Sequence, residues 1–292
     1  MTKLWLLLLL PYTVLAGKIT KEENEMLKIK CSLKASVLSR VKRRQPASSY
    51  EYPFAAALCI RRIVPGGEIE EHSLPTCSGV LISPRHILTS AVCLYMDYQR
   101  SCTHGLRPPK LSAENIGVLL SSRCTNSECW FNEKMLRPTS VVMHPSYEDC
   151  MRDGSYDLAV IELDKDVRTA PICMPGAYSA ISRPENLRYI GYGEVDEHQG
   201  LQSLWYRYIL EEGRTIFAYN MTMKTDHGAE DNGGPLVQKM EGKHYLFGIH
   251  AGYGYRVHNS GGRQIPVAEG AVFADVRKQL TWICDVTGVC SL

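Results

Sequence analysis

The chain has no strong charge imbalance and, beyond its first residues, no long apolar run. Its 33 Lys and Arg residues nearly balance its 31 Asp and Glu residues, and the formal net charge is +2. A charge this small gives no field that would attract nucleic acid or an anionic membrane surface. The sequence also contains no internal repeat and no low-complexity tract, so no repeat architecture is expected.

The one long apolar run lies at the N-terminus. Lys3 is followed by the apolar run Leu4 to Leu10 and then by the small-residue pair Ala16-Gly17. A short basic region, an apolar run and a small-residue cleavage site are typical of a signal peptide, and the run is shorter than the ~20 residues that span a bilayer. We therefore expect residues 1–16 to be a signal peptide, the mature chain to start near Gly17 and be secreted, and no membrane span.

Secretion decides how the 11 cysteines are interpreted. In an oxidising compartment cysteines mostly form disulfides, and an odd number leaves one thiol free or paired with another chain. Cys124 and Cys129 have the spacing of half a zinc site, but no His-x3-5-His and no second close cysteine pair completes it. No metal and no cofactor are expected.

The N-terminal segment, residues 17–49, differs in composition from the rest of the mature chain. Its part from Thr20 to Val41 is charged, shows little β alternation and predicts a short helix or irregular segment that carries Cys31. The basic run Arg40 to Arg44 has the pattern of a proprotein-convertase site, and it is equally compatible with a solvated charge run. Residues 50–284 form the expected main domain, and residues 285–292 a C-terminal tail.

Short strands separated by turns dominate from Tyr50 onward. Turn signals stand at Ser83 to His86 and at Glu241 to Lys243. The period changes only at the end, where Val276, Leu280 and Ile283 share one face of a helix. Many evenly spaced strands with one terminal helix indicate an all-β barrel or sandwich. The expected strands are Phe54–Ile60, Val80–Ile82, Ile87–Thr89, Asn115–Leu120, Thr139–Met143, Leu158–Leu163, Leu187–Ile190, Leu204–Leu210, Pro235–Gln238 and Tyr245–Ile249.

Several motifs occur in the order of a known family. The stretch from Cys77 to Cys93 resembles the histidine-loop segment of the chymotrypsin/trypsin family, Asp157 to Leu163 its aspartate strand, and Asp231 to Pro235 its nucleophile turn. The resemblance extends over about Tyr50 to Cys284 and is greatest to the divergent nematode group of that family. It implies two six-stranded antiparallel β-barrels, a C-terminal helix and an ancestral cleft between the barrels. Further matching segments are Pro171–Pro175, Gly191–Gly193, Val272–Val276 and Trp282–Ile283.

The resemblance also shows which catalytic groups are missing. Asp157 fits the aspartate of the triad, but Val92 stands where the family has its histidine and Asn232 where it has its serine. Valine cannot take a proton, and a carboxamide nitrogen is a very poor nucleophile. Glu230 replaces the oxyanion-loop glycine and brings a negative charge to a site that should stabilise one. We expect a pseudoprotease with no usable proteolysis.

A relocated active site is the alternative in the enzyme class. His86 is most simply a core histidine, His144 lies in a stretch of surface type, and His227 and His250 lie nearer the expected cleft. No serine or cysteine at a sharp strand-to-helix turn is available to pair with them.

The primary pocket and the activation junction also depart from the family. Asp226 stands in the register of the aspartate that binds Arg or Lys side chains, so it is either a residual basic-side-chain pocket or a solvated loop residue. Gly228 replaces a cysteine of the bridge that braces this pocket. Asp231 is retained without its apolar N-terminal partner, because Arg43 to Pro46 replaces the usual activation sequence.

The resemblance implies particular disulfides and leaves others open. The histidine loop implies Cys77–Cys93, and the interdomain connection implies Cys31–Cys173, which would tether the N-terminal segment. A short C-terminal loop suggests Cys284–Cys290, and Cys59 on an apolar strand is the expected free thiol. The remaining cysteines should pair among themselves: Cys102, Cys124, Cys129 and Cys150.

The sequence also predicts one possible glycosylation site and a binding function. Asn220-Met221-Thr222 is the only N-glycosylation sequon, either occupied or unused. The expected function is binding, as a decoy, scaffold or cofactor for extracellular proteins, with a protease or its substrate as candidate partner. The alternatives are a divergent secreted serine-type hydrolase and a matrix component linked through the odd cysteine.

Overall fold

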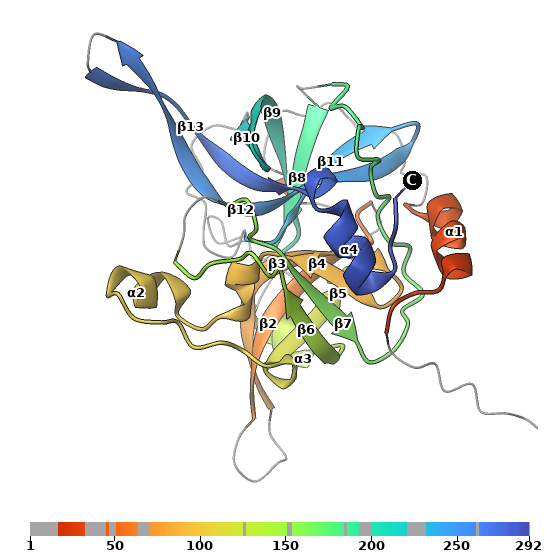
Figure 1. Ribbon diagram of the computed structural model, residues 1–292. Helices are drawn as coiled ribbons and strands as arrows, with labels where there is room; N and C mark the ends of the chain where they lie inside the picture. The colour runs from red at the N-terminus through yellow and green to blue at the C-terminus, as the bar shows by residue number, and fades with distance from the viewer. Residues whose placement is uncertain are drawn as a thin grey trace, which may run out of the picture.

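The computed structural model describes residues 17–32, 45–46, 51–63, 70–124, 127–150, 154–183, 186–192, 200–220, 232–260 and 263–291. Two antiparallel sheets dominate the described chain (Figure 1). They confirm the all-β, trypsin-like two-barrel fold. The expected signal peptide and the basic run lie outside the described residues.

The first barrel has six strands in the order β5-β2-β3-β4-β7-β6. It is open between β5 and β6, where the described bridge Val118–Leu136 spans part of the gap. Strand β7 is buried except for Glu162, which is partly exposed, and the apolar run Leu158 to Ile161 predicts this burial. The strands are β2 (Ala55–Ile63), β3 (Glu70–Ser83), β4 (His86–Thr89), β5 (Ile116–Leu120), β6 (Pro138–Met143) and β7 (Ala159–Leu163).

The second barrel is a closed ring. Its strands follow the order β9-β10-β13-β12-β11-β8, and a β8–β9 pairing closes it; β1 adds to β9 through Gln45 and Pro46. Glu241 and Gly242 both have positive φ in the tight turn between β11 and β12, as the predicted hairpin requires. The strands are β1 (Gln45–Pro46), β8 (Leu187–Gly191), β9 (Gln202–Glu212), β10 (Thr215–Asn220), β11 (Pro235–Met240), β12 (Lys243–Ser260) and β13 (Arg263–Asp275).

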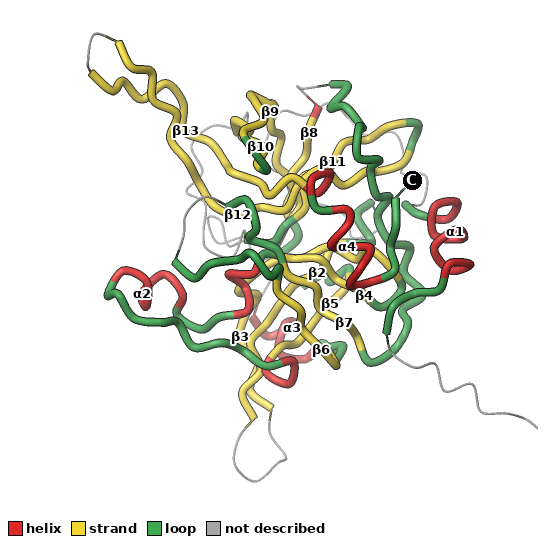
Figure 2. The backbone as a smooth tube through the Cα atoms, in the orientation of Figure 1, coloured by secondary structure: helices red, strands yellow, loops and turns green. Residues whose placement is uncertain are grey.

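Two expectations about the C-terminal half need correction. The strand expected to end at Ile249 continues to Ser260 and returns as β13, and this hairpin projects well beyond the barrel (Figure 2). The expected helix face from Val276 is interrupted, because a 3₁₀ turn, η5 (Val276–Lys278), comes first. Asp275 accepts a hydrogen bond from the Arg277 backbone there, and α4 (Leu280–Thr287) begins after this turn.

The helices lie outside the barrels. The capping box of Thr20 and Glu23 starts α1, because each side chain accepts a hydrogen bond from the other residue's backbone N–H. Helices α2 and α3, in the insertion between β4 and β7, were not predicted. No described helix is long and apolar enough to cross a bilayer. The remaining helices are α1 (Lys21–Lys30), α2 (Tyr98–Thr103) and α3 (Ser127–Asn132), with 3₁₀ turns η1 (Ala91–Leu94) and η2 (Ala113–Asn115).

The N-terminal segment packs against both barrels and the C-terminus. The Arg85 guanidinium, in the β3–β4 turn, binds the carboxylates of Asp166 at 2.6 Å and Glu23 at 2.7 Å. On the other barrel, the Lys243 ammonium donates to the Ile29 carbonyl. Asn24 exchanges two hydrogen bonds with the backbone of Cys290, and α1 and α4 lie on the same side of the molecule (Figure 1).

Candidate functional site

The loop after β4 positions Val92. Ser90 caps the 3₁₀ turn η1, and its hydroxyl oxygen accepts a hydrogen bond from the Val92 backbone N–H at 3.2 Å. The next residue, Cys93, is bridged to Cys77 of β3. A capped turn and a disulfide therefore fix the position where the resemblance expects a catalytic histidine.

Asp157 lies directly against this loop. Its side chain is buried, its Oδ1 accepts a hydrogen bond from the Val92 N–H at 3.0 Å, and its Oδ2 accepts one from the Ser90 hydroxyl at 2.6 Å. The structure thus brings two of the expected triad positions together. They meet through the backbone of residue 92, because the valine side chain offers no nitrogen.

The turn that carries Asn232 packs against the same region. Its carbonyl accepts a hydrogen bond from the Ser78 N–H of β3 at 2.8 Å. Gly233 has φ +82°, and a Cβ on it would lie 2.2 Å from the Ser78 carbonyl oxygen. The Gly233 N–H donates to the His250 carbonyl of β12. Only a glycine fits this position, and the turn contacts both barrels through these backbone hydrogen bonds.

Ser78 is a site residue that the sequence analysis missed. Besides meeting Asn232, its buried hydroxyl accepts a hydrogen bond from the Tyr192 N–H at 2.8 Å. Tyr192 belongs to the Gly191–Gly193 segment and packs edge-on against Trp130 of α3. The only sequence signal for Ser78 is its place directly after Cys77.

Several predicted site residues cannot be placed. Asp226, His227, Glu230 and Asp231 lie outside the described residues, so the oxyanion and pocket assignments remain predictions. Asn220 is the last residue of β10 and pairs with Tyr206 of β9 through its backbone.

The described histidines near the barrels are enclosed. His86 is buried, its Nδ1 lies 2.7 Å from the Ser83 hydroxyl, and burial lowers its pKa to about 4. His250 is buried among the rings of Tyr189, Tyr253 and Phe273.

His144 is the buried residue of a stretch that is otherwise at the surface, since Val142, Pro145 and Ser146 are exposed. The His144 ring lies between those of Tyr156 and Trp282, with ring centroids 4.8 Å away in each case. The aromatic neighbours come from the β6–β7 connection and from α4, which a motif in β6 alone does not reveal. None of these three histidines faces open solvent as a general base for an outside substrate would.

The cysteines pair as the sequence analysis expected, and the four in the insertion form two bridges. Cys59 is buried and unbridged, and burial raises the pKa of its thiol to about 12. Glu133 lies beside Cys124 and Cys129, but those two sulfurs are bonded to each other and are not thiolate ligands. The bridges are Cys31–Cys173, Cys77–Cys93, Cys102–Cys150, Cys124–Cys129 and Cys284–Cys290.

Comparison with known proteins gives one family and several distant relatives. Residues 3–290 match the nematode trypsin-6-like family. The chain is 25% identical to glucanase inhibitor protein 3 of Phytophthora infestans over 72% of its own length and 78% of that protein. It is 26% identical to CLIP domain-containing serine protease B15 of Anopheles gambiae, over 72% of the chain and 61% of the protease. It is 27% identical to spermosin of Halocynthia roretzi, over 80% of the chain and 59% of spermosin.

Proposed function

Because the chain belongs to the nematode trypsin-6-like family, we propose that it is a secreted, inactive serine-protease homologue that acts by binding other extracellular proteins. Its role is that of a decoy, scaffold or cofactor, with a protease or a protease substrate as partner. The proposed mature chain comprises the N-terminal segment from Gly17, the trypsin-like domain at residues 50–284 and a short tail.

The contact between Asp157 and residue 92 carries the proposal. In the triad mechanism the aspartate orients an imidazole that takes the nucleophile's proton. Here the Asp157 carboxylate accepts hydrogen bonds from the Val92 backbone and the Ser90 hydroxyl, and residue 92 carries no titratable group. Asn232 supplies no hydroxyl or thiol. Loss of the serine or histidine of a comparable triad lowers turnover by about 10⁶-fold.

Two other functions receive less support. A relocated active site needs an accessible base; of the four candidate histidines, His86, His144 and His250 are buried, and His227 lies outside the described residues. A matrix role through the odd cysteine needs Cys59 at the surface, and its side chain is buried on β2. One of the similar proteins bears the name of an inhibitor, which is compatible with a binding role on this fold.

Glycosylation belongs to the same proposal. Asn220 ends strand β10, and a secretory route would expose its sequon to the glycosylation machinery. Treatment with peptide N-glycosidase should give one mobility step, and Asn220→Gln should abolish that step. Secreted protein that shows no shift would remove this part of the proposal.

The direct test is to restore the missing groups. A variant that combines Val92→His and Asn232→Ser should still cleave an arginine peptide ester far more slowly than trypsin, because Glu230 and the missing pocket bridge remain. Trypsin-level cleavage by this variant would show that only two side chains separate the chain from an enzyme.

The binding half of the proposal needs its own experiment. The full secreted chain, immobilised and exposed to its native extracellular fluid, should retain a protein at constant stoichiometry. The same chain with its disulfides reduced is the control and should not retain that protein. If native and reduced chains retained the same set of proteins, the binding role would lose its support.

A further inference from the structure

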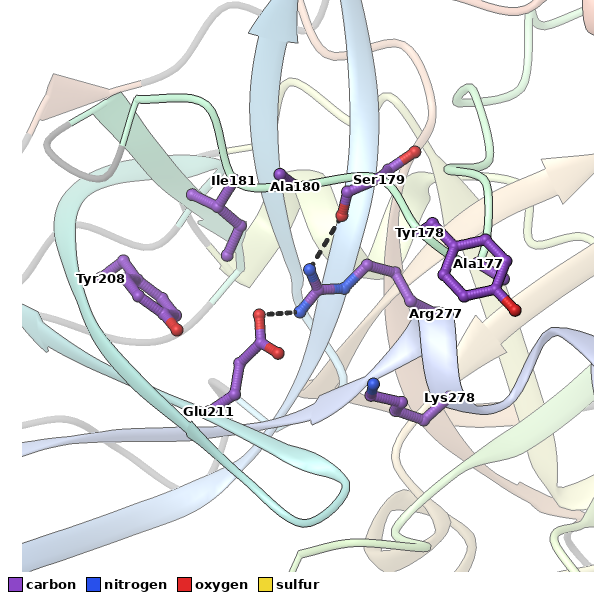
Figure 3. Close-up of a pocket in the computed structure, with 9 residues that line it drawn as sticks. All are labelled: Ala177, Tyr178, Ser179, Ala180, Ile181, Tyr208, Glu211, Arg277 and Lys278. Atoms are coloured by element: carbon purple, nitrogen blue, oxygen red, sulfur yellow. Dashed lines mark hydrogen bonds and ion pairs between the residues drawn. The ribbon is translucent and has the colours of Figure 1, made fainter.

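A cavity of about 390 Å³ lies at one end of the second barrel, apart from the triad positions. It lies beyond the end of the β8–β9 pairing at Tyr206, between residues 177–181 of the segment before β8 and the part of β9 from Tyr208 to Glu211. Its volume is at the small end of the range of ligand pockets, about 300–1,000 Å³, and suits one or two side chains. The lining residues are Ala177, Tyr178, Ser179, Ala180, Ile181, Tyr208, Glu211, Arg277 and Lys278 (Figure 3).

A β-bulge directs two of these side chains into the cavity. The β9–β10 register shifts between Phe217 and Ala218, so that Ile209 of β9 is an extra residue. In a strand without this extra residue, Tyr208 and Glu211 would point to opposite faces, since successive side chains alternate between the two faces of a strand. The bulge brings both to the cavity side, and re-aiming a side chain is a common role of bulges beside functional sites.

The floor of the cavity is a buried arginine with two carboxylates. The Arg277 Nε and Nη2 donate to the two oxygens of buried Asp275, at 2.9 and 2.7 Å, and Nη1 donates to the Ser179 carbonyl at 2.9 Å. Asp275 therefore already balances the charge of Arg277. Glu211 is a second carboxylate on the same guanidinium, and about a third of its side chain, 36%, is exposed. Arg277, Asp275 and Glu211 together carry one net negative charge, and Lys278 at the rim of the cavity is the cation that offsets it.

Two aromatic rings border that charge. Tyr208 and Tyr178 stand on opposite sides of the Arg277–Glu211 ion pair (Figure 3). Tyr178 is fully exposed, an unusual position for a large ring and one typical of a binding anchor. The pKa of Tyr208 is raised, first by burial and then by the charge of Glu211, which agrees with a negative potential at this wall.

The rim is held in place before any ligand arrives. The Gly176 N–H donates to the Ser179 hydroxyl, and the Ser179 N–H donates to the Gly176 carbonyl. On the far side, Ser182 donates two hydrogen bonds to the Gln238 side chain. A fixed rim lowers the entropy cost of binding.

We propose that this cavity binds a lysine or arginine side chain of an extracellular protein partner. Glu211 pairs with the ligand's cation, and the tyrosine rings cover its sides, as aromatic rings do around cations in other proteins. Lys278 is an exposed cation at the rim, and a bound cation displaces its flexible ammonium group. The site is independent of the triad positions and does not depend on whether the chain is inactive.

The test titrates the full secreted protein with N-acetyl-arginine amide, followed by saturation-transfer NMR. The neutral isostere N-acetyl-citrulline amide is the matched ligand. We expect a dissociation constant in the millimolar range for the arginine probe, given its small size, and about tenfold weaker binding of the citrulline probe. Equal binding of the two probes, or no binding of either, would overturn the proposal.

Two variants that change the charge of the cavity test whether it prefers a cation or an anion. Glu211→Gln keeps an acceptor for Arg277 and should weaken the arginine probe about tenfold, whereas Lys278→Gln should strengthen it about twofold by removing a repelling charge. Glu148→Gln, an exposed glutamate on the insertion, is the control and should change nothing. If Glu211→Gln instead strengthened binding of the arginine probe and Lys278→Gln weakened it, the cavity would be an anion site and the proposal would be contradicted.

Discussion

Each oxygen of the Asp157 carboxylate accepts a hydrogen bond, one from the Val92 backbone and one from the Ser90 hydroxyl. Both donors lie in the loop that starts η1, so the carboxylate stabilises the conformation of that loop. In a working triad the same carboxylate acts on a histidine ring. In this chain, therefore, substitutions of Asp157 should change stability.

Asp157→Ala should lower the free energy of unfolding by about 3 kcal/mol. The change removes two hydrogen bonds to a charged acceptor and leaves the partly buried Val92 N–H without one of its partners. Asp157→Asn, which keeps an acceptor oxygen, should cost about 1 kcal/mol. Urea denaturation of the three proteins measures this. If alanine and asparagine had equal and negligible effects, Asp157 would not support the loop.

His244 makes stability depend on pH. It is buried against the rings of Tyr52 and Phe54, and burial lowers its pKa to about 4. An unfolded histidine, with an ordinary pKa near 6.5, binds a proton more readily. The folded state therefore has the full stability that neutral His244 allows above about pH 6.5. It loses that stability as the pH falls toward 4, because protonation favours the unfolded state.

His244→Phe should reduce this loss. Between pH 7 and pH 5 the wild-type chain should lose about 2 kcal/mol more of unfolding free energy than the variant, because the variant has one histidine fewer to protonate. Denaturation curves at both pH values give the difference. His104→Gln, at an exposed histidine, is the control and should keep the wild-type slope; a wild-type slope in His244→Phe as well would contradict the assignment.

At the scale of elements, α1 is held by contacts distant in the sequence. The Arg85 guanidinium joins Glu23 of α1 to Asp166 of the first barrel, and these contacts raise the pKa of Arg85 while they lower that of Asp166. The helix buries Leu27 in the core, whereas Met26 and Ile29 are exposed. Its attachment therefore combines this one apolar contact with polar contacts and the bridge of Cys31.

Arg85→Gln should loosen α1. We expect a loss of about 2 kcal/mol in unfolding free energy, because the two carboxylates it frees are partly exposed and regain water. Hydrogen exchange should speed up in Lys21–Lys30 and stay slow in the core strand β7. Arg107→Gln, at an exposed arginine, is the control and should change exchange nowhere. Unchanged protection of α1 in the Arg85 variant would show that the ion pairs of Arg85 do not hold the helix, and would assign its attachment to the disulfide and the other contacts of the segment.

The sequence predicted the elements whose signals are local. The apolar run that begins strand β7 and the turn at Glu241-Gly242 lie where expected, because burial on both faces of a strand and two positive φ angles need particular residues. The length of the β12–β13 hairpin was not predictable, since β13 contains Pro266 and its partner strand is rich in glycine, which both favour turns. Helices α2 and α3 are too short for a helical period to be recognised.

The residues of the candidate site also divide into those with a local sequence signal and those without one. Val92, Asp157 and Asn232 were predicted because each lies in a contiguous motif. Ser78 and the cavity around Glu211 were not, because they depend on contacts between distant segments and on a bulge at one residue of β9.

At the scale of the whole molecule, the bridge Cys31–Cys173 spans 142 residues and ties the N-terminal segment to the connection between the barrels. Ser32 continues this contact, since its N–H donates to the Pro171 carbonyl and its hydroxyl accepts from the His244 N–H. Cleavage in the basic run would therefore leave the segment attached.

Replacing Cys31 and Cys173 together by serine should lower the unfolding free energy by about 4–5 kcal/mol, the amount expected for a loop of this length. The same replacement of Cys124 and Cys129, which close a short loop, should cost about 2 kcal/mol. Thermal or urea denaturation compares the two double variants. A larger loss from the short loop would mean that the N-terminal tether does not stabilise the assembled barrels.

The central claim is that this trypsin-like molecule contains no activated nucleophile. Labelling of the full-length chain with a fluorophosphonate probe tests it most directly, with active trypsin as the positive control and heat-denatured chain as the background. We predict that the native chain is labelled no more than the denatured chain. Specific, stoichiometric labelling of the native chain that is lost on denaturation would reveal a reactive serine and contradict the account.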